Sequence, residues 1–422
     1  MDTSLENSVR CLLRFGFPPD FDRAEAYLRE LLEPAAALPP QGKRPMHELL
    51  EEIVGEIVER SGTDRIVIPL TAGLDSRAIL GATLRCVPKE RILCVTFGRE
   101  TDRDVIGART VCATLGLEWN WTDVAVIPWS VEEVRCGVLT THQHFGSYAA
   151  QTVVRLLHIQ RLLGPNSIYL SGYLGGLTGT VLRDETDRPS WAVVRLLSSN
   201  STFTDSIAYD VESLCANLEA FAKRWKKRMK GFRSFSCYEA LHLGFRQALR
   251  IRGAVAPFQR VALPLEDPRW VRYWYDQRRF HRLRQRRYIQ DMRTAYPEVF
   301  CLQGDSAPVP PLRYRGLRTI ARQQFLRPEP VAAVLRRKAG GGERDAPSDF
   351  RDFEVNPSCQ QTYAAMLAAL DSRGILPEVN FSERLAGFTE RPSRRNLDYI
   401  THGVRAEAHL RAGTLTGIAA DR

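Results

Sequence analysis

The sequence predicts an α/β protein with a doubly wound parallel sheet, followed by a largely helical C-terminal part. Between residues 64 and 125, short apolar runs rich in β-branched residues alternate with stretches of helical periodicity. From about residue 205 onward the pattern is mainly helical. At roughly 100–200 residues per domain, the 422 residues fit two or three domains. We expect an N-terminal helical segment over 1–60, an α/β domain over 61–300 and a basic helical region over 301–422.

Two helices are predicted before the first strand. Asp20–Leu31 reads as a short amphipathic helix, and Pro34–Pro45 is rich in Ala and Pro, which is typical of a linker. Met46–Arg60 carries Leu49, Leu50, Ile53 and Ile57 at helical spacing. This second helix should therefore pack one apolar face against the sheet domain.

The α/β pattern follows in strict alternation. We predict strands at Arg65–Leu70, Arg91–Phe97 and Glu118–Val124, with helices at Asp75–Leu84 and Asp104–Leu115 between them. Consecutive β-α-β units place their strands parallel, with helices on the faces of the sheet. A further helix at Ala150–Leu163 and a further strand at Ser167–Ser171 continue the pattern, and a glycine-rich segment follows.

The segment Pro69–Leu80 (PLTAGLDSRAIL) joins the first predicted strand to its helix. Ligands of open parallel sheets bind at this edge, beyond the carboxyl ends of the strands. The small residues Thr71, Ala72 and Gly73 allow an anion to approach the backbone, whose N–H groups are free at a helix start. Asp75 beside phosphates is repulsive unless a cation such as Mg²⁺ bridges the two. The segment therefore predicts a phosphate-binding loop with a metal.

This loop resembles the SGGLDS loop of the N-type ATP pyrophosphatases, also called PP-loop enzymes. With Arg77 included, it is most similar to the synthetase domain of asparagine synthetase. Gly73, Leu74, Asp75 and Ser76 match, whereas Thr71 and Ala72 replace Ser and Gly. Val95–Gly98 and the helix after it continue the resemblance. The family implies an adenine nucleotide α-hydrolase-like fold that uses ATP and Mg²⁺.

The resemblance also implies site residues. Asp75 is expected to be the metal ligand and a catalytic residue, and Arg286 falls near the position of the family's catalytic lysine. Thr96, Phe97 and Gly98 are expected in the adenine and ribose pocket. The full set expected to bind the nucleotide is Leu70, Thr71, Ala72, Gly73, Leu74, Asp75, Ser76, Arg77, Thr96, Phe97, Gly98, Ser171, Gly172 and Gly175.

The chain departs from the family at two motifs. Only some 60 residues precede the loop, so we expect no glutaminase domain. The glycine-rich segment Ser171–Gly179 lacks the family's acidic residues: the metal-binding acid would fall at Gly176 or Leu177, and the next carboxylate is Asp184. Magnesium tolerates one protein carboxylate, because it keeps water and phosphate ligands.

The resemblance implies an AMP-forming carbon–nitrogen ligase. A carboxylate, carried by a small molecule, peptide or glycan, would be adenylated and then attacked by an amine. Aspartate, as in asparagine biosynthesis, is one candidate. Ammonia could come from a separate partner protein. Two alternatives stay open: a catalytically degenerate nucleotide-binding subunit, and a tRNA-modifying PP-loop enzyme.

The net charge and the cysteine content limit which partners and which cellular compartment the protein can be expected to have. The net charge of +10 favours polyanionic ligands, and Arg313–Lys338 is rich in arginine, but no known nucleic-acid-binding motif is present. Nucleic acid is therefore disfavoured as a partner. The nine cysteines form no CxxC pair, which is typical of reduced thiols in a cytoplasmic protein. No signal peptide or long apolar run is visible, so we expect no membrane association.

Overall fold

A computed structural model describes residues 3–411 of the chain, apart from 16, 18–19, 42–43, 141–149, 165, 180–186, 199–208, 249–257, 259, 301–352, 354, 377–378 and 391–393. Asp184 and the basic segment Arg313–Lys338 lie outside these described residues.

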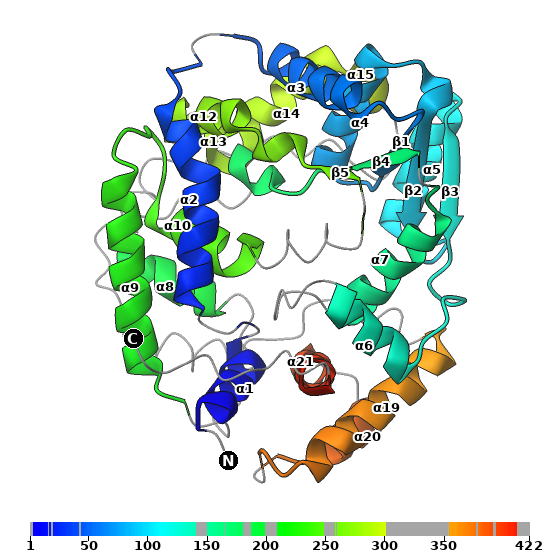
Figure 1. The fold of residues 1–422 in the computed structure, drawn as a ribbon, viewed down its shortest axis with the longest axis vertical. Helices are drawn as coiled ribbons and strands as arrows, with labels where there is room; N and C mark the ends of the chain where they lie inside the picture. The colour runs from blue at the N-terminus through cyan, green and yellow to red at the C-terminus, as the bar shows by residue number, and fades with distance from the viewer. Residues whose placement is uncertain are drawn as a thin grey trace.

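A five-stranded, all-parallel sheet forms the centre of the α/β part (Figure 1). Its order is β3-β2-β1-β4-β5. The strands are β1 (Arg65–Pro69), β2 (Ile92–Phe97), β3 (Glu118–Thr122), β4 (Ser167–Leu170) and β5 (Val261–Ala262). The four strands predicted from apolar runs are confirmed. The fifth was not predicted, because a two-residue strand leaves no readable alternation.

The two faces of the sheet bury alternate side chains of the same strands. Ile66 and Ile68 of β1 join the large core that includes α3 (Met46–Ser61), α4 (Leu74–Cys86) and α5 (Arg103–Leu115). Val67, between them, packs on the opposite face with Leu156 and Ile159 of α7 (Ala150–Leu162). Helices thus cover both faces, as a doubly wound α/β fold requires.

Helix α2 (Phe21–Ala37) begins where the sequence predicts but ends later. The Asp20 side chain accepts a hydrogen bond from the Arg23 backbone N–H and caps the helix. The helix continues through Pro34, so the expectation of a linker from Pro34 was wrong for its first residues. Proline in the last turn removes one backbone donor, and the buried Leu31, Leu32 and Ala35 outweigh that loss.

A set of helices and turns from the later part of the chain packs around the large core with α2, and in Figure 1 α8, α9 and α10 lie on the side of the molecule away from the sheet. It is built from α8 (Pro189–Ser198), α9 (Val211–Arg228), α10 (Cys237–His242), the π-helical turn η3 (Leu243–Gln247), α12 (Pro268–Asp276), α13 (Arg279–Arg282), α14 (Arg286–Ala295) and α15 (Pro297–Phe300). Short 3₁₀ turns lie at η1 (Lys89–Arg91), η2 (Gly175–Thr178), η4 (Pro264–Glu266) and η5 (Leu283–Gln285).

A second core joins segments from both ends of the chain. The C-terminal helices α19 (Pro357–Ser372), α20 (Phe381–Glu390) and α21 (Arg394–Arg411) pack there with α1 (Thr3–Phe15) and α6 (Val131–Thr140). Val9 and Leu12 of α1 face this core, whereas Cys11 and Phe15 face the large one. Helix α1 therefore lies between the two cores. In the described part of the chain, no helix is long and apolar enough to cross a membrane.

Candidate functional site

The chain turns sharply after β1, and side-chain hydroxyls hold the turn. The Leu70 N–H still bonds to the Val95 carbonyl at 2.9 Å, and α4 begins four residues later at Leu74. Between them, the Thr71 hydroxyl accepts from the Gly73 N–H at 3.0 Å and lies 3.1 Å from the Ser76 hydroxyl. The predicted strand, loop and helix are all present.

Asp75 lies in the first turn of α4 with a desolvated carboxylate. The residue as a whole is half-buried, but its Oδ1 atom is shielded from solvent and has no hydrogen-bond partner. Burial raises the pKa of Asp75 to about 6, and a hydrogen bond from Tyr288 opposes part of that increase. An unpartnered carboxylate oxygen is costly to bury, which makes this atom the strongest candidate for a cation ligand.

The glycine-rich segment after β4 packs directly on Asp75. A Cβ at Gly172 would lie 3.1 Å from the Asp75 carbonyl carbon, and a Cβ at Gly175 would overlap the Asp75 carboxylate. A side chain at Gly175 would have to displace the carboxylate, and one at Gly172 would be tight. Strands β1 and β4 are neighbours whose connections run to opposite sides, so the two loops meet at the switch point where parallel sheets bind ligands.

The Asp75 carboxylate is the group at this edge of the sheet that could hold a magnesium ion. Asp75 provides one buried carboxylate oxygen, and the carboxylate packs against Gly175 and interacts with Tyr288. Among the described residues, no cluster of three or more His, Cys, Asp or Glu side chains could hold a metal. If magnesium binds Asp75, phosphate oxygens and water can supply its other ligands.

The end of β2 is fixed by two tryptophans of β3. The Thr96 hydroxyl donates to the Leu70 carbonyl at 2.9 Å and accepts from Trp119 Nε1 at 3.0 Å. Trp121 Nε1 donates to the Gly98 carbonyl at 2.9 Å. Phe97 is half-buried, and its ring contacts His158 of α7 on the other face of the sheet. The predicted adenine-side residues thus lie next to the loop, with the Thr96 hydroxyl engaged inside the protein.

The two arginines among the predicted site residues, Arg77 and Arg286, lie in different surroundings. Arg77 is buried in α4, and its Nη1 approaches the Val299 carbonyl at 3.5 Å. Arg286 is exposed at the first position of α14, and its guanidinium lies over the Phe280 ring. The residue of α14 that interacts with Asp75 is Tyr288, two positions further on, and its hydroxyl also approaches the Leu74 carbonyl at 3.5 Å. No signal in the sequence separates Tyr288 from the other aromatic residues of this region.

A buried ion pair holds the far side of the glycine segment. Arg282 is fully buried, forms an ion pair with Glu239 and donates two hydrogen bonds, of 3.1 and 2.7 Å, to the Leu177 carbonyl. Gln285 donates to the Thr178 hydroxyl at 2.7 Å. Because a Cβ at Gly179 would overlap the Arg282 carbonyl, this contact also needs glycine. Arg282 thereby clamps the segment that faces Asp75.

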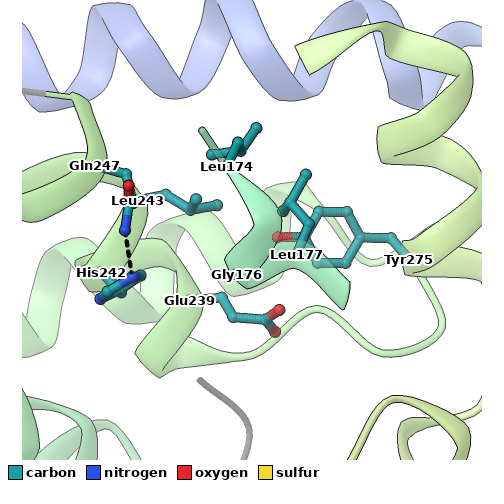
Figure 2. Close-up of a pocket in the computed structure, with 8 residues that line it drawn as sticks. All are labelled: Leu174, Gly176, Leu177, Glu239, His242, Leu243, Gln247 and Tyr275. Carbon is teal, nitrogen blue, oxygen red and sulfur yellow. Dashed lines mark hydrogen bonds between the residues drawn. The ribbon is translucent and has the colours of Figure 1, made fainter. Parts of the chain in front are cut away.

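A small pocket lies on the clamped side of the segment (Figure 2). Figure 2 shows the Glu239 carboxylate beneath Gly176 and Leu177, with His242 and Gln247 hydrogen-bonded to each other at 2.9 Å. The remaining lining residues are Leu174, Leu243 and Tyr275. The space holds about one water molecule, so it is too small for a substrate.

The structure therefore brings the loop after β1, the glycine segment after β4 and the end of β2 to one edge of the sheet. Arg286 lies at the surface of the adjoining helix. Compared with known proteins, the chain matches no protein-family model and no curated protein sequence.

Proposed function

We propose that the chain is an ATP-dependent ligase of the asparagine-synthetase type, which adenylates a carboxylate and forms an amide. One observation carries the proposal. A desolvated, unpartnered carboxylate oxygen of Asp75 lies at the switch point of a parallel sheet, between a phosphate-type loop and a glycine segment. This arrangement supports a site for a metal–nucleotide complex.

Each element of the site has a role in this reaction. The N–H groups at the start of α4 and the hydroxyls of Thr71 and Ser76 would bind phosphate oxygens, exchanging their present mutual bond for bonds to the ligand. Asp75 would hold Mg²⁺ together with phosphate and water. The ion, when bound, neutralises charge on the leaving pyrophosphate. Tyr288 would orient the Asp75 carboxylate.

The chemistry balances in two steps. A carboxylate oxygen of the substrate attacks the α-phosphorus of ATP, and the bond to the β-phosphate oxygen breaks, which releases pyrophosphate. An amine or ammonia then attacks the acyl carbon, AMP leaves with the bonding electron pair, and the nitrogen loses a proton to solvent. The protein contributes positioning and charge stabilisation rather than covalent chemistry.

The test combines binding with turnover. Calorimetry would measure ATP binding with and without Mg²⁺, and a pyrophosphate assay would screen carboxylates with hydroxylamine as a general nucleophile. Asp75→Asn should abolish Mg²⁺-dependent release. Asp64→Asn is the matched control, because Asp64 is exposed at the opposite end of β1. Undiminished release in Asp75→Asn would refute the proposed role of this residue.

A second candidate is a nucleotide-binding subunit without catalysis. It is favoured by the missing acids, since Gly176 and Leu177 of the glycine segment line the pocket beside Glu239. Nucleotide binding without pyrophosphate release, over a broad range of carboxylates and amines, would support this candidate over the ligase.

A further inference from the structure

One carboxylate of the protein already occupies the loop. The backbone N–H of Ala72 donates a 2.9 Å hydrogen bond to Oδ1 of Asp104. Asp104 is exposed in the first turn of α5, and it follows Ala72 by 32 residues. Ala72 lies in the turn between β1 and α4, so its N–H belongs to the group expected to contact phosphate. A carboxylate oxygen thus occupies a position suited to an anion.

The surroundings of this bond carry positive charge. The pKa of Arg77 is lowered by burial and by the nearby Arg103, and it is raised by Asp104, so the three charges interact. Helix α5 comes close to the loop at Gly107, where an added Cβ would lie 3.0 Å from Ala72 Cβ and 3.3 Å from Arg77 Nη2. The Ala72 N–H thus lies near the Arg77 guanidinium, and positive charge there favours an anion.

We infer that Asp104 is an internal ligand of the phosphate loop and competes with the nucleotide for the Ala72 N–H. One N–H group donates one strong hydrogen bond, so a phosphate oxygen and the Asp104 carboxylate exclude each other. Their negative charges also repel. Nucleotide binding therefore requires that Asp104 leave the loop, which lowers the apparent affinity by the cost of that release. This inference rests on the proposed function.

If Asp104 had a positioning role, its removal would change the nucleotide affinity in the opposite direction. If Asp104 only held the loop in a binding-competent shape, its removal would weaken nucleotide binding. Competition instead predicts a gain of affinity when the charge is removed. The sign of the change separates the two roles.

The experiment uses the full chain and two probes, inorganic pyrophosphate with Mg²⁺ and a non-hydrolysable ATP analogue with Mg²⁺. Asp104→Asn removes the charge but keeps an oxygen that can accept from Ala72, and Asp104→Ala removes both. We expect Asp104→Ala to bind each probe about three- to ten-fold more tightly, because the lost bond is charged but solvent-exposed. Asp104→Asn should gain less, because its oxygen can still accept from the Ala72 N–H while the repulsion between the charges is gone. Glu100→Gln, which removes an exposed charge paired with Arg109 before the same helix, should leave the affinity unchanged.

Hydrogen exchange gives an independent readout. Without ligand, the Ala72 amide should exchange faster in Asp104→Ala than in the wild type, and pyrophosphate should protect it in both. Equal or weaker binding by the Asp104 variants, with measurable wild-type binding, would overturn the competition. Absence of binding in all variants would instead defeat the proposed function and the inference with it.

Discussion

Replacement of Asp75 by asparagine should stabilise the protein at neutral pH. Burial raises the pKa of this carboxyl from an ordinary value of 3.8 to about 6. A shift of roughly two units corresponds to about 3 kcal/mol. Because the residue is only half-buried, the realised effect should lie at about 1–3 kcal/mol.

The sign follows from proton binding. Between the two pKa values, the folded state holds the proton while the unfolded state releases it. Stability therefore falls as pH rises from about 4 to about 6, and the full penalty remains above that range. Asparagine does not ionise and avoids the penalty. The advantage of Asp75→Asn should thus be largest at pH 7 and vanish near pH 4.

Urea unfolding of the wild type, Asp75→Asn and Asp64→Asn across pH 4–7.5 measures this difference directly. Subtraction of the wild-type curve removes the titration of all other groups. An Asp75→Asn variant that is equally or less stable than the wild type at pH 7, or a gain that does not depend on pH, would refute the assignment of a desolvated carboxylate. The same carboxyl must ionise to hold Mg²⁺, so Mg²⁺-dependent nucleotide binding should weaken below about pH 6.

Three further predictions concern the packing of the site. Gly175→Ala should displace the Asp75 carboxylate, which should cost about 1–3 kcal/mol of stability and abolish Mg²⁺-dependent nucleotide binding in calorimetry. Gly164→Ala is the control: no atom lies within 4 Å of its added Cβ, so stability and binding should both stay unchanged. Arg282→Met should lower the free energy of unfolding in urea by about 3–5 kcal/mol, because Glu239 is left buried without its partner. Adding Glu239→Gln should recover part of that loss. A cost below about 1 kcal/mol for Arg282→Met alone would contradict the clamp. Thr96→Val should cost about 1–3 kcal/mol, because the Leu70 carbonyl and the Trp119 indole both lose a partner, and wild-type stability would contradict this.

The local sequence predicts the sheet and the loop because both depend on short-range patterns. The runs at β1 and β2 are apolar, β-branched and followed by helical periodicity, and the small residues at 71–73 are typical of a turn that binds anions. Strand β5 has only two residues and takes its place through pairing with β4. Helix α2 passes Pro34 because of the core that it buries. Neither the position of β5 nor the length of α2 can be predicted from the local sequence alone.

The contacts that define the site arise from tertiary structure. Tyr288, Asp104 and Gly175 reach the loop from three different elements, and their separations in the chain carry no periodic signal. The arginine-rich run 282–287 illustrates the limit. The resemblance puts Arg286 near the family's catalytic lysine, but Arg286 is exposed, and its neighbour Arg282 is a buried partner of Glu239.

The orientation of the glycine segment explains how a site with one acid could operate. Gly175 faces Asp75, but Gly176 and Leu177, where the resemblance places the second acid, line the pocket beside Glu239. A carboxylate at either position would lie near an existing buried acid whose charge Arg282 already balances. Such an acid would add repulsion there rather than a second ligand beside Asp75. Under the proposed function, most of the charge and ligands for Mg²⁺ would come from the nucleotide, so the ion should bind weakly alone and tightly with ATP.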